Sequence, residues 1–178
     1  DLITGSGQVA GVTAAVADDA DITIKISDTV SANYSRVNTL ADLSGFTGDI
    51  EATISGSATN LSGADLNNLS NGAGHSDNIA FQVVGDATTA QLKTLSDRTT
   101  ASNITVSGNI TGAISTFITN GTTSKTNEYT EALAHTTDEP ISLSEVTISS
   151  GAIIDQVNAL FSGADTDTVI TGTLTDDS

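Results

Sequence analysis

Short segments of alternating β-branched and polar residues recur along this chain at a nearly regular spacing. They begin at Ile22, Ile50, Ile79, Ile104, Val146 and Val169, so that successive starts lie 28, 29, 25, 42 and 23 residues apart. A period-2 pattern of Ile, Val and Thr is typical of β-strands. Its return at a period near 25 to 29 residues predicts a repeat architecture, because a fixed period of this size is the signature of stacked units.

Apolar residues three or four positions apart follow the predicted strands after a polar turn. The groups are Val37, Leu40 and Leu43; Leu66 and Leu69; Leu92 and Leu95; Ile114, Phe117 and Ile118; and Ile153, Val157, Leu160 and Phe161. This spacing predicts short amphipathic helices, with Ser, Thr or Asp as N-caps and Gly45, Gly121 and Gly163 as stop signals. The long step after Ile104 would hold one further unit if residues 129–134 form a weaker strand.

A strand, a short helix and a second strand make a connection long enough to return the chain parallel to itself, whereas an antiparallel hairpin needs only a short loop. Repeating a right-handed crossover to the same side stacks the units. We therefore expect an α/β fold, a right-handed strand-helix solenoid with one parallel β-sheet and short helices on the opposite side. The alternative is an all-β sandwich, in which the leucine pairs lie in loops.

The expected organisation is a single repeat domain with an irregular start. The chain has 178 residues, which is the size of one ordinary domain. Residues 1–20 form an irregular first unit or a cap, and residues 21–178 form the solenoid. Its expected units are 21–48, 49–77, 78–102, 103–127, 128–144, 145–168 and 169–178. The absence of an initiator Met suggests a processed or excised piece of a longer protein.

The charge of the chain argues against two classes of partner. Asp and Glu number 22 against 5 Lys and Arg, for a formal net charge of −17, and such a field repels phosphate backbones and anionic lipid. No apolar run approaches the roughly 18 residues of a membrane helix, and the first residues lack the features of a signal peptide. We expect no nucleic-acid binding and no membrane insertion. The acidic, Thr-, Ser- and Asn-rich composition favours an extracellular or cell-surface location.

The sequence contains no recognisable catalytic arrangement. There is no cysteine, which excludes thiolate zinc sites and cysteine nucleophiles. His75 and His135 have no partner at metal-ligand spacing, and no G-x-S-x-G motif occurs. A lyase or hydrolase on a parallel solenoid is the least favoured class, because six aromatic residues and no Trp leave little surface for sugar stacking. We expect no enzyme activity.

Calcium is the one cofactor for which the sequence offers candidate ligands. Asp165 and Asp167 at one turn, and Asp18, Asp19 and Asp21 at another, are clusters of the hard oxygen donors that calcium prefers. Neither the EF-hand spacing nor the glycine-rich calcium-binding nonapeptide occurs. A specific calcium site is therefore a hypothesis, and its alternative is diffuse screening of the carboxylates by cations.

Two stretches of the chain share a longer motif. ITIKISDTVSANYSRVNTLADLSGFTGDIEATIS and IAFQVVGDATTAQLKTLSDRTTASNITVSG follow the pattern I-T-I-S-D, a small polar linker, N-x-L-x-x-L and G-x-x-x-A-T-I-S. This pattern resembles the repeats of giant secreted and cell-surface proteins of marine cyanobacteria and related marine bacteria, including the swimming-associated type. The resemblance covers about residues 21–120, and residues 128–150, with Pro140, depart from it. It implies a structural or adhesive role outside the cell and supplies no catalytic residues.

The repeats lead to an expected function. Solenoid contacts are made between neighbouring units, so length is extended by adding units. We expect a structural repeat module of an extracellular or cell-surface protein, a spacer, filament or surface-layer scaffold that self-associates head-to-tail or laterally. The alternative is an adhesin or phage-fibre module that recognises a surface glycan or protein. Tyr34, Phe46 and Tyr129 are too few and too scattered to form an aromatic binding cluster.

Overall fold

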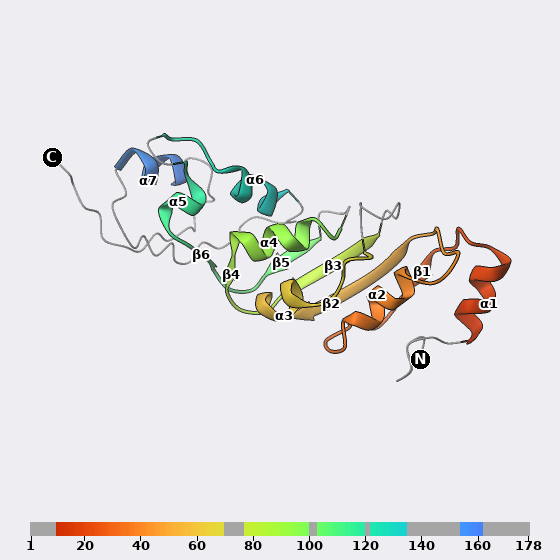
Figure 1. Ribbon diagram of the computed structural model, residues 1–178. Helices are drawn as coiled ribbons and strands as arrows, with labels where there is room; N and C mark the ends of the chain where they lie inside the picture. The colour runs from red at the N-terminus through yellow and green to blue at the C-terminus, as the bar shows by residue number, and fades with distance from the viewer. Residues whose placement is uncertain (1–9, 70–76, 100–102, 120–121, 135–153, 162–178) are drawn as a thin grey trace.

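A computed structural model describes residues 10–69, 77–99, 103–119, 122–134 and 154–161. Its helices are α1 (Ala10–Asp18), α2 (Ser35–Ala41), α3 (Ala58–Gly63), α4 (Thr89–Ser96), α5 (Ile114–Phe117), α6 (Asn127–Leu133) and α7 (Ile154–Phe161). Its strands are β1 (Ile24–Lys25), β2 (Ile50–Gly56), β3 (Asn78–Val83), β4 (Ala87–Thr88), β5 (Ile104–Val106) and β6 (Ile110–Thr111). These elements follow one another along an elongated body, from α1 at one end toward α7 at the other (Figure 1).

The main sheet has four strands in the order β1-β2-β3-β5, and all neighbouring strands are parallel. The order of the strands in the sheet follows their order in the chain, so each connection moves the chain one position in the same direction. A second sheet pairs β4 with β6, also in parallel. The expected α/β class with a parallel sheet is confirmed, and the described residues contain no antiparallel sandwich.

The core lies between the sheet and the helices. Strand residues alternate in burial, and the buried ones of neighbouring strands lie in register, as Ile54, Phe81 and Ile104 do. All three are fully buried. Figure 1 shows α2, α3 and α4 on one face of the sheet, where Leu40 and Leu92 are also fully buried. Each coil, meaning one strand with its following helix, thus shelters its apolar residues against the adjacent coil, because burial of apolar surface is the main stabilising term.

Most predicted helices are found where the leucine spacing placed them. The groups at residues 37–43, 92–95 and 114–118 overlap α2, α4 and α5, although Leu43 and Ile118 follow the ends of their helices. The group at residues 153–161 overlaps α7, and Ile153 lies outside the described residues.

Of the helices predicted from apolar spacing, α4 has the expected cap, whereas α2 and α5 follow Tyr34 and Ala113 without a side-chain cap. The helices α3 and α6, which the spacing did not predict, also begin at a Ser or Thr cap. The caps are Ser57, which accepts from the Asn60 N–H; Thr88, which forms a capping box with Gln91; and Thr126, which accepts from the Tyr129 N–H.

The helix predicted around Leu66 and Leu69 is wrong. The helix of this coil, α3, begins at Ala58, directly after β2, because Ser57 supplies an N-cap there. Leu66 and Leu69 follow α3 in a segment without helix or strand, yet both are buried in the core. Their apolar spacing therefore marks burial and not helical structure.

The weaker strand predicted at residues 129–134 is also wrong. This segment belongs to helix α6, which begins after the Thr126 cap and packs against α4. The described residues after β5 therefore contain the short strand β6 and three helices, α5, α6 and α7. The strands predicted at Val146 and Val169 lie outside the described residues.

Residues 10–18 form helix α1, and Val12 and Val16, one helical turn apart, are buried in the core. The helix lies beyond β1 at the end of the sheet (Figure 1). It lies within residues 1–20, for which the sequence predicted an irregular first unit or a cap, and that prediction stays open.

Candidate functional site

The candidate calcium ligands are only partly covered by the described residues. Asp18, Asp19 and Asp21 lie at the end of α1 and in the following turn, and all three are exposed. The Asp21 N–H donates a hydrogen bond to Asp19 Oδ1 (3.1 Å), so this carboxylate has a role in closing the turn. Asp165 and Asp167 lie outside the described residues.

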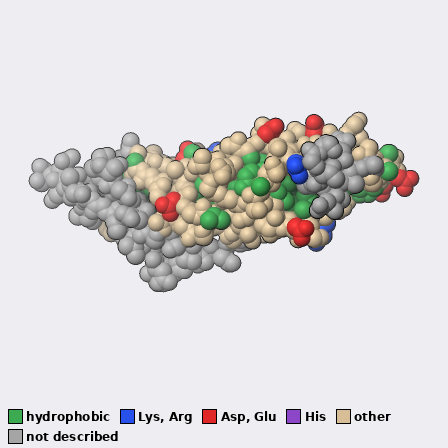
Figure 2. Space-filling model, turned by 90° about the horizontal axis from the view of Figure 1, so that it is seen from below, with side chains coloured by type: hydrophobic (Ala, Val, Ile, Leu, Met, Phe, Trp, Pro, Cys, Tyr) green, Lys and Arg blue, Asp and Glu red, His purple; other side chains and the backbone are tan. Residues whose placement is uncertain are grey.

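Among the residues that the structure describes, no group of three or more Asp, Glu, His or Cys side chains is arranged to hold a metal ion. Figure 2 shows acidic side chains as separate spots on the visible face. His75 and His135 lie outside the described part of the chain. Within that part, no helix is long and apolar enough to cross a membrane. The calcium site stays a prediction.

Buried polar side chains make contacts that join neighbouring coils. Asn38 on α2 is buried, and its amide donates to Asp65 Oδ1 (3.4 Å) and accepts from the Asn68 N–H (2.7 Å). The Ile50 N–H donates to the fully buried carboxylate of Asp77 (2.7 Å). In both cases the partners are 27 to 30 residues apart, about one repeat, so these buried polar groups fix how one coil sits on the next.

Arg98, which follows α4, makes a related contact with the end of α3. Its guanidinium is buried and donates to the carbonyl oxygens of Leu61 (3.0 Å) and Ser62 (3.5 Å) near the end of α3. Both carbonyls lie in the last turn of α3, where a cation is favourable, and the Leu61 carbonyl also accepts from the Ala64 N–H (3.4 Å). Burial lowers the pKa of Arg98, and the nearby carboxylates of Asp65 and Asp97 oppose that shift.

Helices α4 and α6 are joined by polar contacts of the same kind. Lys93 lies between Asp97 (3.0 Å) and Glu131 (3.1 Å), and hydrogen bonds to these two carboxylates raise its pKa. The Thr89 hydroxyl donates to the Glu128 carboxylate. Side chains of one coil thus bind the helix of another coil along the helix layer.

Two glycines mark places where neighbouring coils touch through their backbones. A Cβ atom at Gly48 would lie 1.9 Å from the carbonyl oxygen of Ile22, and one at Gly108 would lie 2.3 Å from the carbonyl carbon of Gly85. Neither approach tolerates a side chain. The interval between these partners is again close to the repeat length, so the glycines allow successive coils to stack at strand spacing.

The opposite side of the main sheet carries polar residues in rows across the strands. We call it the outer face. Its residues are Lys25, Glu51, Thr53, Ser55, Asn78, Ala80, Gln82, Thr105 and, just before β5, Asn103. The register aligns Lys25 with Glu51 and Asn78, Thr53 with Ala80, and Ser55 with Gln82 and Thr105. These residues are exposed or half-buried.

Contacts between strands order the outer face. The Lys25 ammonium lies 2.8 Å from the Glu51 carboxylate, a hydrogen bond and ion pair that raise the pKa of Lys25. The Asn103 amide donates to Asn78 Oδ1 (2.8 Å). Alternation of side chains along a strand places every second residue on this face, but the pairing of side chains across strands depends on register, which the sequence pattern alone did not fix.

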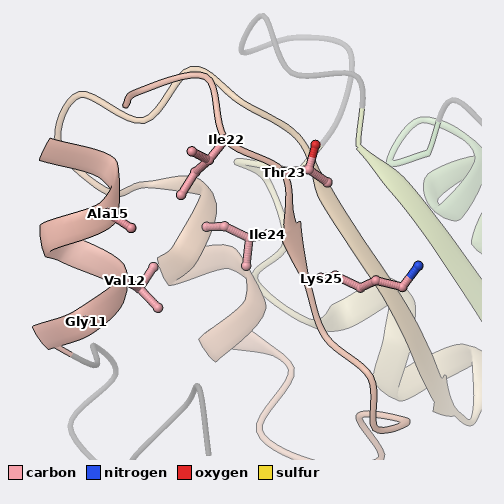
Figure 3. A pocket seen from close by; sticks show the side chains of 7 residues that line it. All are labelled: Gly11, Val12, Ala15, Ile22, Thr23, Ile24 and Lys25. Atoms are coloured by element: carbon pink, nitrogen blue, oxygen red, sulfur yellow. The ribbon is translucent and has the colours of Figure 1, made fainter. Parts of the chain in front are cut away.

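An apolar hollow of about 360 Å³ lies between α1 and β1. Its lining residues come from both elements: Gly11, Val12, Ala15, Ile22, Thr23, Ile24 and Lys25. In Figure 3, Val12 and Ile24 point into the space between the helix and the strand, while the end of the Lys25 side chain points away from it. The lining offers aliphatic groups and no arrangement of polar groups for chemistry on a substrate.

Comparison with known proteins gives no match to any family model, curated protein or solved structure. Function must therefore be inferred from the geometry. Among the described residues, the contacts that recur from coil to coil are those between successive coils, and they stabilise an elongated stack.

Proposed function

We propose that this chain is a structural repeat module of an extracellular or cell-surface protein, acting as a spacer, filament or surface-layer scaffold. We further propose that its coils form a right-handed solenoid, since nearly all parallel strand-helix-strand connections have this hand. The resemblance of its motif to repeats of giant marine bacterial surface proteins supports the proposed location. The proposal includes self-association of the module.

The single observation that supports this proposal most is that strands join the parallel sheet in chain order. Contacts between the helix-side segments of neighbouring coils, such as Asn38 with Asp65, link residues about one repeat apart. A body stabilised in this way grows in length by addition of coils, without redesign of a central core. That property suits a spacer or scaffold.

Small-angle scattering on the dilute full chain tests the elongated shape. A compact globular protein of 178 residues would have a radius of gyration of about 16 Å. We expect a clearly larger value and a distance distribution with the long tail of a rod. A value at the compact limit would contradict the spacer role.

Antibody labelling of the producing cells tests the proposed location. We expect gold particles at the cell surface or on material outside it in electron micrographs. Labelling confined to the cell interior would contradict an extracellular scaffold.

The second candidate, an adhesin or phage-fibre module that recognises a glycan or protein, is favoured by the exposed, ordered outer face of the sheet. A glycan array tests it: binding of one class of surface glycan would favour this alternative over a scaffold.

A further inference from the structure

We propose that the outer face of the sheet is the surface on which a second copy of this chain docks, so that two molecules pair laterally, sheet against sheet. This inference rests on the self-association included in the proposed function and names the surface that would serve it.

Charge is the first reason to choose this face. Two chains of net charge −17 repel each other, and the repulsion is strongest where carboxylates come close. The ionisable residues of the outer face are Lys25 and Glu51, which neutralise each other at 2.8 Å. The outer face is therefore locally neutral within a strongly acidic chain. Two copies that meet through their outer faces bring together surfaces whose own charges cancel.

The architecture of the sheet is the second reason. Parallel sheets usually have both faces covered by other elements. Here α2, α3 and α4 lie on one face (Figure 1), while Asn78, Gln82 and Thr105 on the other are exposed. Sheets pack face to face at about 10 Å, so a second sheet would supply the cover that this one lacks.

The chemistry of the side chains favours a second copy as the occupant. Asn, Gln, Ser and Thr each offer both hydrogen-bond donors and acceptors, which makes a face built from them complementary to itself. The outer face contains no aromatic residue, and a sugar-binding surface would be expected to use one for stacking. The Asn103 side chain already donates to Asn78 across neighbouring strands, and a side chain that is ordered before docking loses less entropy on docking.

The test is sedimentation velocity of the full chain and of Gln82→Glu over a range of concentrations, at low and at high salt. Wild type should associate, and more strongly at high salt, because screening weakens the repulsion between acidic chains. Gln82 lies on β3 within the outer face and is exposed, so the substitution changes charge with almost no change in shape. It should weaken the dimer at least about tenfold, since it places an unpaired carboxylate in each half of the interface.

Two controls isolate the effect. Ala90→Glu adds the same charge at an exposed position of α4, in the helix layer, and should change the dissociation constant by less than about twofold. Mixing Gln82→Glu with Gln82→Lys should restore association, because opposite charges then meet across the interface. Thermal melting of each variant shows whether the fold is retained.

Three outcomes would overturn the inference. If wild type associates and Gln82→Glu associates equally well, another surface is used, and the self-associating scaffold stands. If wild type stays monomeric at every concentration and salt, self-association fails as well, while the scattering test of the elongated spacer is unaffected. If wild type stays monomeric but binds a neutral polysaccharide in a manner that Gln82→Glu abolishes, the occupant is a glycan.

Discussion

The middle of the sheet and its N-terminal end are built from the same kind of coil, but they differ in how many neighbours each coil has. Strands β2 and β3 share six register pairs, while β1 and β2 share two. Ile54 and Phe81 are fully buried, whereas Ile24 in β1 is 5% exposed and borders the hollow of about 360 Å³ beneath α1.

This difference shows where the stability of the fold originates. A coil in the middle is covered on both sides, and a terminal coil is covered on one side by a coil and on the other by α1 alone. In a repeat protein each unit is stabilised mainly by its nearest neighbours. Equivalent substitutions should therefore cost more in the middle than at the end.

The largest expected effect on the free energy of unfolding comes from a matched pair of side-chain truncations, one in the middle of the sheet and one at its end. Ile54→Ala should reduce the free energy of unfolding by about 4 kcal/mol, because it opens a cavity between packed coils. Ile24→Ala should reduce it by about 2 kcal/mol, since the hollow beside Ile24 means that fewer contacts are lost. Urea unfolding of both variants provides the measurement, and equal losses would contradict the comparison.

The next largest loss of stability is expected from a substitution at Gly48. It tests whether the terminal coil is stacked as closely on its neighbour as the other coils are. Gly48→Ala should cost about 2 to 3 kcal/mol, because its Cβ atom would lie 1.9 Å from the Ile22 carbonyl oxygen. The control is Gly11→Ala in α1, where a Cβ atom meets nothing within 4 Å. This change should stabilise the helix by up to about 1 kcal/mol. Similar melting temperatures for the two variants would mean that β1 is not packed as described.

A smaller effect is expected at helix α6, where the stability of the protein should depend on pH through Tyr129. Burial raises the pKa of Tyr129 above its ordinary value of 10.0, and its ring packs edge-on against Phe117 at 5.2 Å. The unfolded chain therefore releases this proton at a lower pH than the folded protein does. Stability should be complete below pH 10 and should fall as the pH rises from there through the raised pKa of the folded state.

Thermal melting of wild type and Tyr129→Phe between pH 8 and about 11 checks this prediction. The variant should lose less stability than wild type over the alkaline range. Parallel curves for the two proteins would show that the Tyr129 hydroxyl is not shielded from water.

The smallest expected effect concerns the exposed ion pair at the N-terminal end. Lys25 and Glu51 are 2.8 Å apart, but the Lys25 side chain is 73% exposed, and solvent-exposed pairs contribute little. Lys25→Gln should leave the melting temperature of the dilute monomer unchanged within error. A clear loss would mean that the outer face contributes to the stability of a single molecule.

The sequence was sufficient to predict the parallel sheet, because the alternation at Ile50 and Ile79 identifies strands and the spacing between them requires a crossover. Leucine spacing was also sufficient to predict α2 and α4. At α4 the Thr88 cap supports the same prediction, whereas α2 begins without a side-chain cap. The helix that leucine spacing predicted at Leu66 and Leu69 is wrong, because apolar residues at this spacing can be buried whether or not the backbone is helical.

Residues 129–133 lie in helix α6, although a short segment with Tyr, Thr and Leu suits a strand as well as a helix. The N-cap at Thr126 and the position of α4 decide in favour of the helix. The outer face could be anticipated only as alternating polar positions. Its pairing of Lys25 with Glu51 follows from register, which is a property of the folded sheet.

Hydrogen exchange of the backbone amides tests most directly whether each coil depends on its neighbours. The Phe81 N–H donates to the Asn103 carbonyl in the middle of the sheet (3.0 Å), and the Ile26 N–H donates to the Glu51 carbonyl at its end (2.9 Å). We expect Phe81 to exchange only through global unfolding and Ile26 to exchange through local opening at a lower free energy. Equal protection at the two positions would contradict the stacked-coil account.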